Sequence, residues 1–360
     1  MKKYFKNIKF WTLLLIPLSI FLTLSAKYIN GFADFYYSHI YKYISLIFNH
    51  ITGIFPFSLA EIIVIAFPLT AMIYIILLAV KITSSKGKRL TTALNGLLNI
   101  LCTIAVLLFT FTTNCGINYY KSDVSHTMNI ETNPVSTEEL YKVCVYLAEK
   151  ASDIRENLHQ DENGISIISD NANERAEKYV NSLLNSNYSQ PKSVFFSRTM
   201  SYLNITGVYF PFTFEANVNT DIPNFSIPAT MCHELAHING IMREDDANFI
   251  AFLSCINSGD KEFEYSGYTM AMIYASNALF SADKGKYQDF LQYMSNSVIK
   301  DLNAQSAYWK NFETPVAETA STINDTYLKS NSQSDGVKSY GNMIDLTIAY
   351  LKDKIYRVFE

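Results

Sequence analysis

Two histidines and a glutamate form the stretch of this sequence best suited to chemistry. Residues 231–240 read Met-Cys-His-Glu-Leu-Ala-His-Ile-Asn-Gly, which contains the pattern HExxH. Residues four apart lie on one face of a helix, so His233 and His237 can offer imidazole nitrogens to one metal ion. Glu234 is rotated by about 100° and can reach a water bound to that metal. The spacing predicts a Zn²⁺ site with Glu234 as the catalytic base of a hydrolase.

A third ligand is expected directly after this helix, because a catalytic zinc usually has three protein ligands. Gly240 predicts the end of the motif helix, and a new amphipathic segment begins at Arg243. Glu244 shares a face of that segment with Ala247 and Ala251, whose small side chains would let the two helices approach closely. We therefore expect Glu244 to be the third ligand.

Asp245 and Asp246 are the rival candidates for this role. On an ideal helix they point about 100° and 200° away from Glu244. Their alternative interpretation is an acidic first turn that interacts favourably with the helix dipole.

The run Glu244-Asp245-Asp246-Ala247-Asn248 after HExxH resembles the gluzincin group of metallopeptidases, in which the next helix carries a glutamate ligand within an ExxA(D/N) pattern. The resemblance implies a zincin-like domain with metallopeptidase activity. Glu244 follows His237 by seven residues, where many gluzincins have a longer insertion. This short link is similar to that of the metzincins, whose third ligand lies six residues on, but Arg243 occupies that position here and cannot bind zinc.

The whole chain also resembles an uncharacterised family of bacterial polytopic membrane proteins that carry this HELAH motif. That resemblance covers nearly the full length and implies a predicted zinc-peptidase activity. Besides three apolar spans, it rests on five segments: residues 207–213, 215–219, 243–249, 265–268 and 336–340.

Three stretches are long and apolar enough to cross a bilayer, at residues 10–26, 62–80 and 93–113. The chain as a whole is 49% hydrophobic and only 17% charged, which is unusually apolar for a soluble domain of 360 residues. We therefore expect a membrane domain at 1–114, with three transmembrane helices, and a separate globular domain at 115–360.

Basic residues predict the orientation, because cytoplasmic loops are rich in lysine and arginine. One basic cluster precedes the first span and another separates the second from the third: Lys2, Lys3, Lys6 and Lys9, then Lys81, Lys86, Lys88 and Arg89. The amino terminus is then cytoplasmic and residues 115–360 are extracytoplasmic. The first span is expected to be an uncleaved helix; its alternative is a signal peptide, whose removal would not change the later orientation.

Residues 28–56 are rich in Tyr, Phe and Ile, which suits a helix or re-entrant segment in the outer membrane interface; the alternative is a loop packed on the globular domain. Ser58 with Glu61, and Ser136 with Glu139, are possible capping boxes.

The globular domain is predicted to be α+β and mostly helical, with a small β-sheet before the motif helix. Apolar periodicity predicts helices at 136–159, 171–184, 268–280, 286–312 and 341–359, and strands at 193–197 and 207–214. Pro211 places the second strand at a sheet edge.

Substrate contacts are sought in the residues around this sheet and in polar, glycine-flanked tyrosines. Residues 209–219, including Asn217, are similar to the edge strand that binds an extended peptide in such enzymes, although an ordinary strand is an equal alternative. Tyr268 and Tyr340 are candidate donors to the transition state, against a packing role.

Other classes of protein fit less well. A net charge of −4 without a long basic run argues against nucleic acid as a partner, and five cysteines without a CxxC pair match no zinc ribbon. An intramembrane protease is excluded because residues 224–246 are too polar to span a bilayer. The expected partners are therefore the lipid bilayer and a peptide or protein substrate. The alternatives are a non-catalytic membrane sensor or scaffold with a structural metal, or an amidase acting on the cell envelope.

Overall fold

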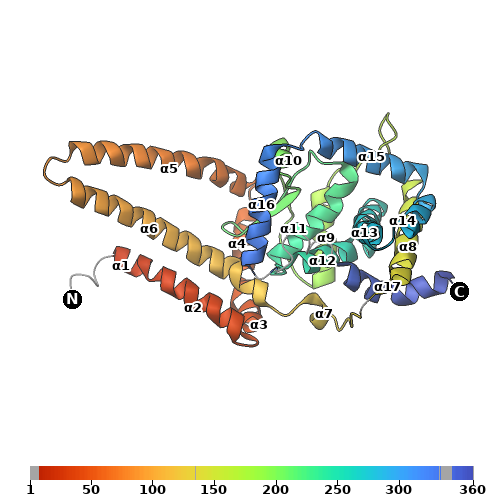
Figure 1. The fold of residues 1–360 in the computed structure, drawn as a ribbon. Coiled ribbons are helices and arrows are strands. Elements are labelled where there is room, and N and C mark those ends of the chain that lie inside the picture. The colour runs from red at the N-terminus through yellow and green to blue at the C-terminus, as the bar shows by residue number, and fades with distance from the viewer. Residues whose placement is uncertain (1–7, 134, 332, 334–342, 360) are drawn as a thin grey trace.

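The computed structural model describes residues 8–133, 135–331, 333 and 343–359, and these form a mostly helical molecule with one small mixed β-sheet. The long helices extend to one side of the molecule, and most other elements form a globular part at one end of these helices (Figure 1).

Among the described residues, three helices are long and apolar enough to cross a membrane. They comprise α1 and α2, which together cover Ile8–Tyr28, then α5 (Leu59–Ser84) and α6 (Arg89–Asn114). Their apolar side chains are largely exposed, since at most 11% of each apolar window is buried within the molecule. The three predicted spans are confirmed as apolar helices of sufficient length, each slightly longer than expected.

A short helical segment connects the first two of these helices. It consists of α3 (Phe32–Tyr36), the π-helix η1 (Tyr37–Tyr41) and α4 (Lys42–Gly53). Residues 28–56 are thus largely helical, and buried residues of α3 and η1 belong to the same apolar core as the motif helix.

The start of α5 is fixed by polar contacts with the globular part. Ser58 accepts a hydrogen bond from the Glu61 backbone N–H, as the predicted capping box requires. The Glu61 carboxylate, however, accepts hydrogen bonds from the backbone N–H groups of Phe195 and Phe196, at 3.1 and 2.7 Å. A tertiary partner has therefore replaced half of that box, whereas the Ser136–Glu139 box forms completely.

The remaining helices of the described residues form the globular part and follow α6 in the chain. They are η2 (Gly116–Tyr120), α7 (Val124–Thr127), α8 (Thr137–Arg155), α9 (Ala172–Leu184), α10 (Ser197–Tyr202), η3 (Asn224–Ser226), α11 (Ile227–Ile238), α12 (Glu244–Ile256), α13 (Lys261–Ala282), α14 (Lys284–Phe290), η4 (Leu291–Tyr293), α15 (Asn296–Lys310), α16 (Pro315–Ser330) and α17 (Met343–Phe359).

The predicted helices are confirmed with two changes. The segment expected at 286–312 is broken into α14 and α15 by η4, and Ser295 caps the second piece by accepting from the Val298 N–H. Helix α16 was not predicted, because it buries only Leu328 and so lacks a clear apolar stripe.

The sheet has the strand order β1-β3-β2, with β1 (Lys192–Ser193) parallel and β2 (Gly207–Phe210) antiparallel to the central β3 (Glu215–Val218). Both predicted strands are shorter than expected. Helix α10 begins at Ser197, and the run after Gly207 turns at Pro211 and returns as β3. Strand β2 lies at the edge, as Pro211 predicted.

Two apolar clusters make up the core, and the motif helix α11 lies between them. One contains residues of α8, α12, α13 and α17, and the other contains residues of η1, η2, α9, β2 and β3. Ala236 of α11 belongs to the first cluster, while Leu235 and Ile238 belong to the second. Because α11 is buried on both sides, it is largely apolar apart from His233, Glu234 and His237.

Candidate metal centre

The motif helix α11 ends in a turn that requires glycine. Pro228 lies in its first turn, where a missing N–H costs nothing. Gly240 has a φ of +73°, in the left-handed region, and the Ile241 N–H donates back to the Ala236 carbonyl at 3.1 Å. A Cβ at position 240 would also lie 2.7 Å from the Tyr37 ring. The chain can therefore reverse tightly and bring α12 alongside α11.

This turn also orients the second histidine of the motif. The His237 Nδ1 lies 2.7 Å from the Ile241 carbonyl oxygen, which can only accept, so Nδ1 carries the proton and donates. The Nε2 atom is then the nitrogen left to bind a metal. A backbone carbonyl that fixes the ring and its tautomer is a typical outer contact of a metal-binding histidine.

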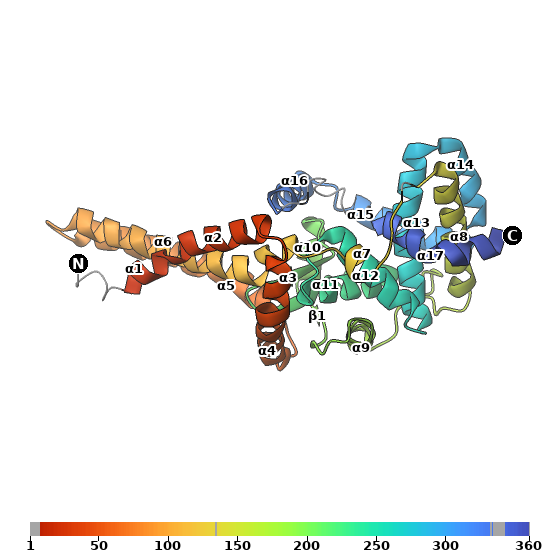
Figure 2. The ribbon, with the colours of Figure 1, turned by 90° about the horizontal axis from the view of Figure 1, so that it is seen from below.

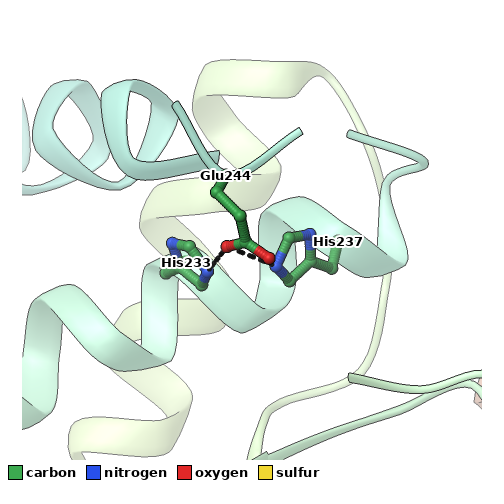
Figure 3. Close-up of side chains that lie close together, drawn as sticks. All are labelled: His233, His237 and Glu244. Atoms are coloured by element: carbon green, nitrogen blue, oxygen red, sulfur yellow. Dashed lines mark ion pairs between the residues drawn. The ribbon is translucent and has the colours of Figure 1, made fainter. Parts of the chain in front are cut away.

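Glu244, the first residue of α12, reaches both histidines (Figure 3). Its Oε2 lies 3.2 Å from His233 Nε2 and 3.6 Å from His237 Nε2. Ala247 and Ala251, one and two turns further along α12, are fully buried. Small side chains at these positions allow α11 and α12 to pack closely enough for the Glu244 carboxylate to contact both histidines.

These three residues form a buried group that could hold a metal ion. One ligand atom from each lies within 4.8 Å of the others, and all three side chains are buried. Ligands at about 2.1 Å from a tetrahedral zinc are about 3.4 Å apart, close to the measured separations from Glu244 Oε2. Two imidazoles and a carboxylate also match the donors that divalent transition metals prefer. The residues present therefore fit a metal.

The group is strongly coupled electrostatically when it is free of metal. Burial lowers the pKa of His237, but Glu244 and Glu234 outweigh this and raise it to about 9. Burial raises the pKa of Glu244, but His237 and His233 outweigh this and lower it to about 2. Near neutral pH the carboxylate is thus charged and ready to accept a cation.

Glu234 lies under the edge strand β2. A Cβ at Gly207 would stand 2.5 Å from Glu234 Oε1, so only glycine allows this approach. The Tyr209 backbone N–H is hydrogen-bonded to the carboxylate, and the other oxygen, Oε2, is buried without a hydrogen-bond partner among the described residues. Burial raises the pKa of Glu234, against the opposing effect of His233 and His237. A raised pKa suits a general base.

His233 and Glu234 line a cavity of about 830 Å³. Its other walls come from the segment before and within β2, from Tyr274 and Trp309, and from one side of α16; the lining residues are Leu203, Asn204, Ile205, Thr206, Gly207, Val208, Tyr274, Trp309, Ala320, Ser321, Ile323, Asn324 and Tyr327. A cavity of this size is large enough for several side chains of an extended peptide.

The rival carboxylates next to Glu244 have other partners. Asp245 is ion-paired with Arg243 at 3.1 Å. Asp246 accepts a hydrogen bond from the Val124 N–H at 3.1 Å and lies 3.6 Å from Arg243. The group that could hold a metal contains Glu244 and neither of these two aspartates.

The predicted substrate-contact residues are not brought to this cavity by the structure. Asn217 lies on the central strand and accepts a hydrogen bond from Ser58 at 2.6 Å, so it fixes the start of α5. Tyr268 is buried in the core, where its ring packs edge-on against Tyr146 and Phe252. Tyr340 lies outside the described residues. The cavity lining contains neither Asn217 nor Tyr268.

Sequence reasoning missed Tyr274, one of two tyrosines among the described residues that line the cavity. It lines the cavity and is hydrogen-bonded to the side chain of Asn248, and burial raises its pKa to about 12. Nothing local distinguishes it among 25 tyrosines. The signal that could have indicated it is Asn248 in the ExxAN run, because Asn248 is hydrogen-bonded to Tyr274 of the later helix α13.

Hydrogen bonds join η1 to the motif helix and β2 to the end of α6. The Tyr41 hydroxyl of η1 donates to the Ile238 carbonyl at the end of α11, at 3.0 Å. The Tyr209 hydroxyl of β2 donates to the Asn114 carbonyl at the end of α6, at 3.1 Å. The candidate metal centre is therefore held close to the ends of the apolar helices.

Fold and site together define a class of protein, one with three helices of membrane-spanning length and a buried His-His-Glu group able to hold a metal. Within that class, a family model described as a protein of unknown function, DUF3810, matches residues 36–348, and the chain belongs to this family. No curated protein and no solved structure matches the chain.

Proposed function

We propose that this protein is a membrane-anchored, zinc-dependent hydrolase, most simply a gluzincin-like metallopeptidase that cleaves peptide bonds outside the cytoplasmic membrane. The observation that carries the proposal is the convergence of His233, His237 and Glu244 beside a cavity that also contains Glu234. Three protein donors next to an open cavity are typical of a catalytic metal, whereas a structural site is usually closed by four.

His233, His237 and Glu244 would hold the zinc, which supplies a Lewis acid and lowers the pKa of water. Glu234, whose pKa is raised by burial, takes a proton from the attacking water and returns it to the leaving nitrogen. Tyr274 offers a hydroxyl on the cavity wall toward the oxygen that gains charge. Strand β2 offers an edge along which an extended chain can lie.

The test is the substitution Glu234→Gln in the full chain. The zinc-loaded protein in detergent is incubated with a degenerate mixture of quenched fluorogenic peptides, and zinc content is measured in parallel. We expect the variant to keep its zinc and to lose about 10²–10⁴-fold in turnover, because only the base is removed. Glu174→Gln, at an exposed glutamate on α9, is the matched control. Turnover at the native rate in Glu234→Gln would contradict the proposed role.

A further inference from the structure

Helix α4 presents its polar side to the protein. Ser45, Asn49 and Thr52 are all buried and lie on one face of the helix, at the spacing i, i+4, i+7. Ser45 is hydrogen-bonded to the Tyr188 hydroxyl at 2.7 Å. Asn49 donates to the Phe214 carbonyl at 2.8 Å, and Thr52 donates to the Thr213 carbonyl at 3.0 Å. The contacts that hold α4 to the globular part are thus largely polar.

The apolar side of α4 faces away from the protein. Ile44, Ile47 and Ile51 of α4, with Ile54 directly after the helix, recur at i, i+3, i+7, i+10. All are exposed, Ile47 by 59% and Ile54 by 77%. A helix on a water-soluble domain has the reverse arrangement, with its apolar stripe in the core. A continuous exposed row of this kind indicates an apolar environment on that side.

The position of α4 identifies this environment. In Figure 2, α4 runs across the direction of α5 and α6, at the end of these helices where the globular part begins. A second apolar site lies at the same end: Phe195 and Phe196 are 85% and 52% exposed, and their backbone N–H groups bind Glu61 in the first turn of α5. Both apolar surfaces therefore lie at the end of the predicted spans that adjoins the globular part.

We propose that α4 and the Phe195–Phe196 pair form a lipid-docking surface that lies in the interfacial region of the bilayer, with the isoleucine row and the two phenylalanine rings among the upper acyl chains. Helices that lie in an interface bury their apolar face by about 5–10 Å, and aromatic rings favour this depth. A helix that lies in the interface of a bilayer has to run across the spans at their end, as α4 does. Binding to a protein partner imposes no such direction on the helix.

Docking of α4 would also set the height of the candidate metal centre above the lipid. η1 joins α4 without a break, and Tyr41 of η1 is bonded to the end of α11. Phe214, which accepts from Asn49, directly precedes β3. A rigid connection of this kind keeps the cavity near the membrane surface.

Depth-dependent quenching of tryptophan fluorescence tests this proposal without reference to activity. The full chain is placed in lipid nanodiscs, with Trp11 and Trp309 replaced by phenylalanine, and one tryptophan is introduced by Ile47→Trp, Ile51→Trp or Phe195→Trp. Phe280→Trp is the matched control, since Phe280 is also exposed, by 46%, but packs against Tyr287 of α14, remote from the spans in Figure 1. Lipids carrying a nitroxide at carbon 5 or carbon 12 are the quenchers.

We expect the carbon-5 label to quench the α4 and Phe195 reporters at least twofold more than the control, and more than the carbon-12 label does. Quenching no greater than that of Phe280→Trp would overturn the proposal and indicate a protein partner. Stronger quenching by the carbon-12 label would overturn it as well, because α4 would then lie within the hydrocarbon core. Two reporters on α4 ensure that one poorly folded variant does not decide the outcome.

Discussion

At the scale of single residues, the candidate metal centre depends on a hydrogen bond that fixes the ring of His237. The Ile241 carbonyl holds the proton on His237 Nδ1, so Nε2 points toward Glu244. This arrangement follows from Gly240, whose left-handed conformation brings residue 241 back beneath the ring. The sequence predicted that His233, His237 and Glu244 come together, because HExxH and the short link to Glu244 are local features. It did not predict this bond, which depends on the geometry of the turn.

The charge state of the metal-free site leads to a prediction on proton release. With a pKa of about 9, His237 is protonated at pH 7, and a protonated imidazole cannot bind a metal. Zinc binding at pH 7 should therefore release about one proton, and affinity should fall about tenfold for each pH unit below 9. Above pH 9 this dependence should disappear.

Isothermal titration calorimetry of the metal-free full chain, in buffers of different ionisation enthalpy, measures the number of protons released. A value near zero at pH 7, or an affinity that does not change between pH 6 and 8, would contradict the charge state inferred for His237.

At the scale of elements, the edge strand and the motif helix are in unusually close contact. Gly207 of β2 lies so near Glu234 that an added methyl group would displace the carboxylate. Gly207→Ala should therefore reduce turnover by about tenfold or more while zinc content stays unchanged, since a small misplacement of a base is costly. Gly285→Ala, in α14, is the control, because its Cβ would meet only Asp283 at 3.3 Å.

Peptide turnover and zinc content of both variants check this. Native turnover in Gly207→Ala would mean that the contact with β2 does not position Glu234.

Elements with strong local signals were predictable, and those that depend on distant partners were not. The apolar spans, α8, α9 and α11 have apolar patterns or caps that can be read directly. Residues 209–219 were expected to form an edge strand, but β3 within them is the central strand of the sheet. The role of Asn217 could not be predicted either, because Asn217 contacts Ser58, which is 159 residues away. Helix α16 was not predicted, because it buries only Leu328 and has no clear apolar stripe, although one side of it lines the cavity.

At the scale of the whole molecule, the segment between the first two predicted spans shares an apolar core with the globular part. Residues 115–360 begin where α6 ends, at the predicted boundary, but Ala33, Tyr36 and Tyr41 pack in the same cluster as Leu235. The segment between the first two spans thus belongs structurally to the globular part. We infer that the full chain, and not residues 115–360 alone, is the proper subject of experiments.

The proposed orientation predicts which side of the membrane each part faces. In a Cys102→Ser background, Asn157→Cys should react with a membrane-impermeant maleimide in intact spheroplasts, because Asn157 lies in the globular part. Lys86→Cys, between α5 and α6, should react only after the membrane is permeabilised. The opposite labelling pattern would place the candidate metal centre in the cytoplasm.

Metal analysis of the purified full chain is the most direct test of the central claim, that His233, His237 and Glu244 hold a zinc ion. After exposure to zinc and removal of the excess, the native chain should retain about one zinc ion per molecule. His159→Ala, at an exposed histidine, should retain the same amount, and His233→Ala should retain less than about a tenth of it. Equal zinc content in the native chain and His233→Ala, or no zinc in either, would contradict the account.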